Sequence, residues 1–76
     1  MTKLQESLAD KAASAGFTVK QKGSTVIIFK MNKRGQVKQG LEIEDTGYAF
    51  DMTVMPEMQK AIRNRAEMAQ LLGLGN

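Results

Sequence analysis

The 76-residue chain contains neither cysteine nor histidine. Disulfides are therefore impossible, and zinc sites of the usual Cys/His type are excluded. The same absence removes the strongest side-chain nucleophile and the commonest general base of enzymes. The three serines have no evident base nearby in the sequence. We therefore predict a protein that is not an enzyme, with no catalytic residues, no bound metal and no cofactor.

Long apolar runs are missing as well. The only strongly apolar run is Val-Ile-Ile-Phe at 26–29, whereas a membrane-spanning helix needs about 20 apolar residues. The N-terminal sequence MTKLQESLADK has no apolar segment of the kind found in secretory signals. We therefore expect a cytoplasmic protein with no membrane partner, which agrees with the lack of cysteine.

The length allows one small domain, residues 1–76. A domain this short buries only about 60% of the surface that its unfolded chain exposes. Its core is therefore marginal, and we keep a homodimer among the expected assemblies.

Local patterns predict a helix, four strands and a second helix. Thr2 and Gln5 form a capping-box pattern before a helix at 3–15, and Gly16 stands where such a helix should end. Alternating residues predict strands at 17–22, 25–31, 36–44 and 48–54. Pro56 suits the first turn of a final helix that ends at Gly73. The expected fold is a two-layer α+β domain, in which both helices pack on one face of a four-stranded antiparallel meander.

The register of the strands decides which side chains face the helices. A three-residue turn at 22–24 would pair Phe17 with Phe29 and Val19 with Ile27, and we prefer it because it aligns the apolar residues. Val26 and Ile28 then lie on the opposite face. That face is either open, which makes Val26 and Ile28 candidates for a protein contact, or covered by one of the helices.

Charge is segregated along the sequence. Residues 17–40 carry six bases and no acid, namely Lys20, Lys22, Lys30, Lys33, Arg34 and Lys38. This basic set is a candidate for phosphate binding, and the alternative is an ordinary solubilising surface. No exposed aromatic residue is evidently paired with these charges, so we expect contact with a duplex backbone and not stacking on unpaired bases.

Residues 41–55 carry four acids and no base. A two-residue loop before the last strand would place Glu42 opposite Asp51, with Glu44 on the same outer face. These carboxylates are a candidate site for Mg²⁺ or for a protein partner, and the alternative is a solvated acidic face. We prefer the solvated face, because no loop supplies the further oxygen ligands that a cation needs, and we keep Glu42, Glu44 and Asp51 as candidates for a protein contact.

Four methionines also allow two interpretations. Met31, Met52, Met55 and Met58 form either an adaptable binding surface or the filling of a small core. We expect core filling.

The motif Ala15-Gly16-Phe17, Val19, Gln21-Lys22-Gly23-Ser24 and Ile27-Ile28-Phe29-Lys30 resembles the N-terminal half of HicA-type toxins. These are small ribonucleases with a fold like that of double-stranded-RNA-binding domains. The resemblance covers about residues 4–35, and it implies that Lys22, Lys33 and Arg34 lie near nucleic acid. The family's catalytic histidine follows the Gly-Ser pair, where this chain has Thr25. The resemblance therefore implies a fold and a preference for RNA, but no cleavage.

Together these patterns favour a small non-enzymatic binding module that contacts nucleic acid, preferably a duplex, through its basic region. The alternative is a protein-binding accessory or inhibitor protein, of the kind found in phages or mobile elements. It would act through an acidic or apolar sheet face, and it would work alone or as a homodimer.

Overall fold

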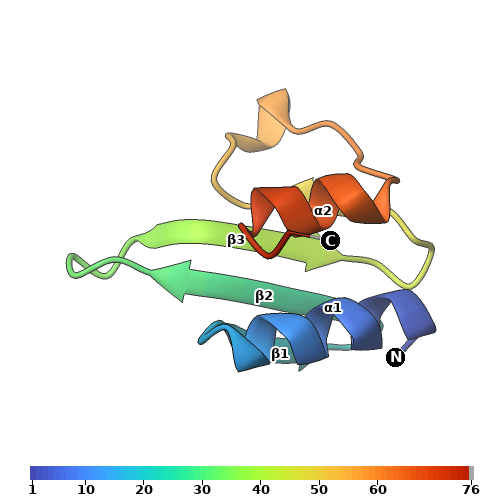
Figure 1. Ribbon diagram of the computed structural model, residues 1–76. Coiled ribbons are helices and arrows are strands. Elements are labelled where there is room, and N and C mark those ends of the chain that lie inside the picture. The colour runs from blue at the N-terminus through green and yellow to red at the C-terminus, as the bar shows by residue number, and fades with distance from the viewer. Residues whose placement is uncertain (76) are drawn as a thin grey trace.

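The computed structural model describes residues 1–75 and has the predicted α+β order. Helix α1 (Lys3–Ser14) is followed by strands β1 (Thr18–Lys22), β2 (Thr25–Met31), β3 (Val37–Ile43) and β4 (Ala49–Asp51). A 3-10 turn, η1 (Pro56–Met58), and helix α2 (Arg65–Leu71) complete the chain. The strands form one antiparallel sheet in the order β1-β2-β3-β4, and both helices lie on the same face of it (Figure 1).

Helix α1 begins and ends with the predicted signals. The Thr2 hydroxyl accepts a hydrogen bond from the Gln5 backbone N–H, and the Gln5 side chain accepts one from the Thr2 N–H. At the other end, Gly16 takes a left-handed φ of 90°, and the Phe17 N–H donates to the Ala12 carbonyl. This is a Schellman motif, which satisfies carbonyls that the helix end leaves free.

The predicted register between β1 and β2 is wrong. Thr18 pairs with Phe29 and Lys22 with Thr25, so the turn contains only Gly23 and Ser24. Gly23 has a φ of 62°, which suits the tight turn of a two-residue hairpin. Turn geometry decides the register here, because both alternating sets within the apolar run 26–29 are hydrophobic.

The shift by one residue exchanges the two faces of β2. Val26 and Ile28 are fully buried under the helices, while Ile27 and Phe29 lie half-buried on the face without helices. The face that carries Val26 and Ile28 is therefore covered by the helices and not open, so neither side chain is available for a protein contact.

The register between β3 and β4 also differs from the prediction. Leu41 pairs with Asp51 and Glu42 with Phe50, so Glu42 does not lie opposite Asp51. The pairing buries Ala49, which also exchanges two backbone hydrogen bonds of 2.8 Å with Ile62. This small residue lets the C-terminal segment approach the sheet, and β4 is three residues long instead of the expected seven.

The C-terminal helix is shorter than predicted. Pro56 begins only a 3-10 turn, and α2 starts after Asn64, whose side-chain oxygen accepts from the N–H groups of Ala66 and Glu67. The extended bridge at Ile62 separates the two helical pieces. Gly73, with a φ of 67°, follows α2, as predicted.

The core lies between the sheet and the two helices. Its fully buried large side chains include Leu8 from α1, Ile28, Leu41 and Ile43 from the sheet, and Met68 from α2. The opposite face of the sheet carries no helix (Figure 1). Within residues 1–75, no helix is long and apolar enough to cross a membrane.

Candidate nucleic-acid interface

The β2–β3 hairpin extends beyond the rest of the domain and ends in a basic tip (Figure 1). We define the hairpin tip as residues 32–36, all of which are exposed. Lys33 and Arg34 occupy its two central positions. These cations therefore lie at the most accessible end of the sheet.

Hydrogen bonds from Asn32 hold the hairpin tip in one conformation. Its side-chain oxygen accepts from the N–H of Arg34 at 2.9 Å and from that of Gln36 at 3.0 Å. The Asn32 N–H donates to the Gln36 carbonyl at 2.8 Å, and Gly35 supplies the left-handed φ of 79° that closes the turn. The turn falls between the strands predicted at 25–31 and 36–44, and it presents the two cations on an ordered backbone.

A β-bulge adds a third cation next to the hairpin tip. Lys30 pairs with Gln39, but Met31 pairs with Val37, so Lys38 is an extra residue on β3. Lys38 is exposed. The bulge thus brings Lys38 to the same end of the sheet as Lys33 and Arg34.

The other three members of the predicted basic set lie elsewhere. Lys20 and Lys22 are exposed on β1, and the Lys20 ammonium lies 5.7 Å from the centre of the Phe29 ring. Lys30 instead faces the helix side, where its ammonium donates to the Ala15 carbonyl at 3.2 Å and lies 4.5 Å from the Phe17 ring centre. Lys30 therefore supports the C-terminal end of α1, where a cation complements the helix dipole.

The face of the sheet without helices, which we call the open face, is more apolar than the sequence suggested. Ile27, Phe29, Val37, Phe50 and Met52 are half-buried there, and Met31 is 52% exposed. Sequence reasoning missed these residues because it placed Phe29 in the core. The two-residue turn at Gly23 and Ser24 was the signal that could have placed Ile27 and Phe29 on this face.

The acidic residues do not share one face. Glu42 is exposed on the open face, level with Ile27 and Phe50. Asp51 lies on the helix side of β4, where it accepts hydrogen bonds from the Thr53 N–H at 2.9 Å and the Thr53 hydroxyl at 2.6 Å. The predicted common acidic face is therefore wrong, and residues 1–75 contain no cluster of three acidic groups placed to hold a cation.

Most of the candidate methionines are at the surface. Met55 and Met58 are 63% and 67% exposed, Met31 is 52% exposed, and Met52 is half-buried. The prediction that they fill the core is wrong, because Met58 lies in a surface 3-10 turn instead of a packed helix, and Met31 and Met52 lie on the face of the sheet without helices. Met68 of α2 is the methionine that is fully buried.

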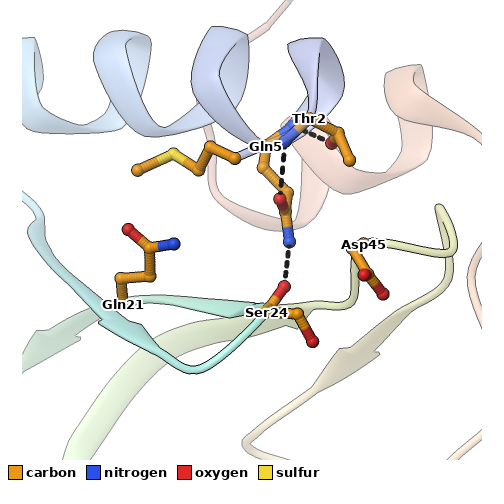
Figure 2. A pocket seen from close by; sticks show the side chains of 6 residues that line it. Thr2, Gln5, Gln21, Ser24 and Asp45 are labelled. Atoms are coloured by element: carbon orange, nitrogen blue, oxygen red, sulfur yellow. Dashed lines mark hydrogen bonds between the residues drawn. The ribbon is translucent and has the colours of Figure 1, made fainter.

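A shallow pocket beside the N-terminus of α1 is a structural junction (Figure 2). At its centre, the Gln5 amide is 1% exposed and donates to the carbonyls of Ser24 and Ile43, each at 2.8 Å. In the described part of the chain, no buried side-chain polar atom lacks a partner. The buried amide at the centre of the pocket therefore has its hydrogen bonds within the chain and is not aimed at a ligand.

The chain matches no protein-family model, no curated protein and no solved structure. The resemblance to HicA-type toxins therefore stays a prediction.

Proposed function

We propose that the protein is a non-enzymatic module that binds the phosphate backbone of a nucleic acid through its hairpin tip. The single observation that carries this proposal is the ordered, projecting turn that presents Lys33 and Arg34, with Lys38 beside them. Arginine and lysine side chains bind phosphates. An ordered backbone loses less conformational entropy when it binds, which favours association.

The chemistry of the hairpin tip favours a duplex over a single strand. Residues 32–36 include no aromatic side chain on which an unpaired base could stack. A narrow projecting hairpin with two cations suits the phosphates that line a groove. We therefore expect binding that depends on backbone shape and charge and only weakly on sequence.

Lys22 does not belong to this interface. It pairs with Thr25 at the start of β2, whereas the hairpin tip follows Met31 at the end of that strand. A seven-residue strand is about 20 Å long, so Lys22 and Arg34 cannot reach the same group of phosphates. We therefore assign the interface to Lys33, Arg34 and Lys38.

The test is fluorescence anisotropy with labelled double-stranded RNA, double-stranded DNA and single-stranded RNA at about 50 and 200 mM salt. Three phosphate contacts correspond to a slope of about −2.7 in the logarithm of affinity against the logarithm of salt concentration, or about a 40-fold loss over this range. We expect the variant Lys33→Glu/Arg34→Glu to abolish measurable duplex binding. The control Lys3→Glu/Lys60→Glu changes the net charge equally at two other exposed positions.

The comparison of the two variants separates the effect of charge at the hairpin tip from the effect of net charge on duplex binding. Equal losses in both would show that net charge, not the hairpin tip, drives binding. No duplex binding by the natural chain at 50 mM salt would overturn the proposal, and a preference for the single strand would contradict its duplex form.

A further inference from the structure

Three of the four strands give the open face parallel columns of side chains with different chemistry, and the β4 side adds the half-buried Phe50 and Met52 at the other edge. On β1, at one edge of the sheet, Lys20 and Lys22 are exposed. On β2, Ile27, Phe29 and Met31 form an apolar column. On the β3 side, Glu42 is exposed, and Glu44 follows just beyond the end of the strand.

The strand pairings place opposite charges on the same levels of the sheet. Lys20 pairs with Ile27, which pairs with Glu42, so these three side chains form one row across the sheet. Lys22 pairs with Thr25, and Glu44 lies one position beyond the Val26–Ile43 pair, which puts it level with Thr25. The apolar column thus runs between a column of cations and a column of carboxylates.

We propose that a second copy of this chain covers the β1–β3 part of the open face, with a two-fold axis that lies between the sheets and runs along β2. Rotation about such an axis places β1 of one copy over β3 of the other. Lys20 then faces Glu42 of the second copy, and Lys22 faces its Glu44, twice over by symmetry. Ile27, Phe29 and Met31 meet their own counterparts across the axis.

This arrangement follows ordinary packing rules. Two sheets that pack face to face lie about 10 Å apart with strands aligned within about 30°, a distance that lysine and glutamate side chains can bridge. A two-fold interface requires a surface that is complementary to itself. The three columns meet that requirement in both charge and apolar character.

The charge pattern also selects between the two possible face-to-face two-folds. An axis across the strands would place β1 over β1 and β3 over β3, so lysines would face lysines and glutamates would face glutamates. Like charges that face each other across an interface repel and disfavour association. The axis along β2 is therefore the one that the surface favours.

The size of the face bounds the affinity. With strands about 4.8 Å apart and the seven-residue strands about 20 Å long, the overlapping strands β1, β2 and β3 give a footprint of roughly 14 by 20 Å. An interface of this size lies below the range of standard specific interfaces and belongs with weak, transient contacts. We therefore expect a dimer with a dissociation constant in the micromolar range.

Variants with reversed charges in the columns test the proposal. Their dimerisation is measured by sedimentation equilibrium at chain concentrations of about 1–500 µM and about 50 mM salt. The variants Lys20→Glu and Glu42→Lys each put like charges face to face, so each should raise the dissociation constant by at least about tenfold. An equimolar mixture of the two should form a heterodimer, because each repelling row becomes an attracting one. The double variant Lys20→Glu/Glu42→Lys should dimerise within a few-fold of the natural chain.

Three results would overturn the proposal. They are a natural chain that stays monomeric at the highest concentration, a dimer that neither single variant weakens, and single variants that do not recover when mixed. The control Lys60→Glu, on the C-terminal loop, should dimerise like the natural chain. Circular dichroism checks that each variant is folded.

If a charge variant fails to fold, distances between spin labels test the proposed dimer instead. The natural chain has no cysteine, so Met31→Cys and Asp10→Cys each accept one spin label. The label at Met31 lies beside the proposed axis, whereas Asp10 lies exposed on α1, on the far side of the sheet. The dimer predicts a shorter label-to-label distance at Met31 than at Asp10, and the reverse order would exclude it. None of these measurements includes nucleic acid, so they test the dimer independently of the proposed function.

Discussion

Phe29 lies directly opposite Gly40 on the neighbouring strand, and two other side chains fill the space above the glycine. A Cβ atom at Gly40 would stand 3.0 Å from both the Val37 Cγ1 and the Met52 Sδ. Gly40 thus allows Met52 and Val37 to close over β3 beside the Phe29 ring. Gly40 is therefore a site of close packing on the open face.

We expect Gly40→Ala to lower the free energy of unfolding by about 1 kcal/mol. Overpacking costs about 1–3 kcal/mol, and the lower entropy of an unfolded chain with alanine offsets part of that cost. Urea unfolding followed by circular dichroism measures the change. The double variant Gly40→Ala/Met52→Ala should cost less than the sum of the two single variants, because the thioether no longer meets the new methyl group. Strict additivity would show that the two residues do not compete for this space.

Gln5 connects three parts of the chain that are distant in sequence. We expect Gln5→Ala to lower the free energy of unfolding by about 2–4 kcal/mol, because it leaves the Ile43 carbonyl buried without a donor and also removes the bond to Ser24. Urea unfolding checks this value. Gln70→Ala, at an exposed position on α2, is the matched control and should change stability by less than about 0.5 kcal/mol.

Asn64 is the N-cap of α2, so Asn64→Ala should cost about 1 kcal/mol of stability. The variant Asn64→Asp keeps an oxygen that accepts from the Ala66 N–H, and it should retain most of that stability. Thermal unfolding of the two variants tests the cap. Equal losses for alanine and aspartate would indicate that the amide has another role.

The hairpin tip offers a test of order without a change of charge. Asn32→Ala removes the oxygen that accepts from Arg34 and Gln36, so the turn becomes mobile while Lys33 and Arg34 remain. We expect a several-fold loss of duplex affinity with an unchanged salt slope, since the number of phosphate contacts stays the same. A slope that falls with Asn32→Ala would mean that a cation had left the interface. Unchanged affinity would show that order at the tip is unimportant.

Local signals predicted the parts of the fold that local chemistry determines. The Thr2–Gln5 capping box and the glycine-closed turn at 32–35 depend on residues within a few positions of one another, and the structure has both. The predicted hairpin tip follows from the same short-range chemistry. Antiparallel order and the two-layer arrangement follow from short turns and from helices that need an apolar partner.

Long-range choices were harder to derive from the sequence. In the run 26–29, the pair Val26 and Ile28 is as apolar as the pair Ile27 and Phe29. Hydrophobicity alone therefore does not determine which pair faces the helices. The choice depends on the two-residue turn and on how the alanine-rich face of α1 packs against the branched side chains. The bridge between Ala49 and Ile62 is similarly invisible in sequence, and it is the reason that the final helix starts at Arg65.

The same bridge has a use for engineering the molecule. Two backbone hydrogen bonds of 2.8 Å join Ala49 to Ile62, and they close the intervening chain as a surface loop with exposed residues at 55–58. The free energy of closing a loop rises only slowly with its length, by about 0.6 kcal/mol for each doubling. An epitope or a fluorescent peptide inserted at 56–57 would therefore leave the sheet, the hairpin tip and the open face unchanged, and would give the protein a built-in reporter.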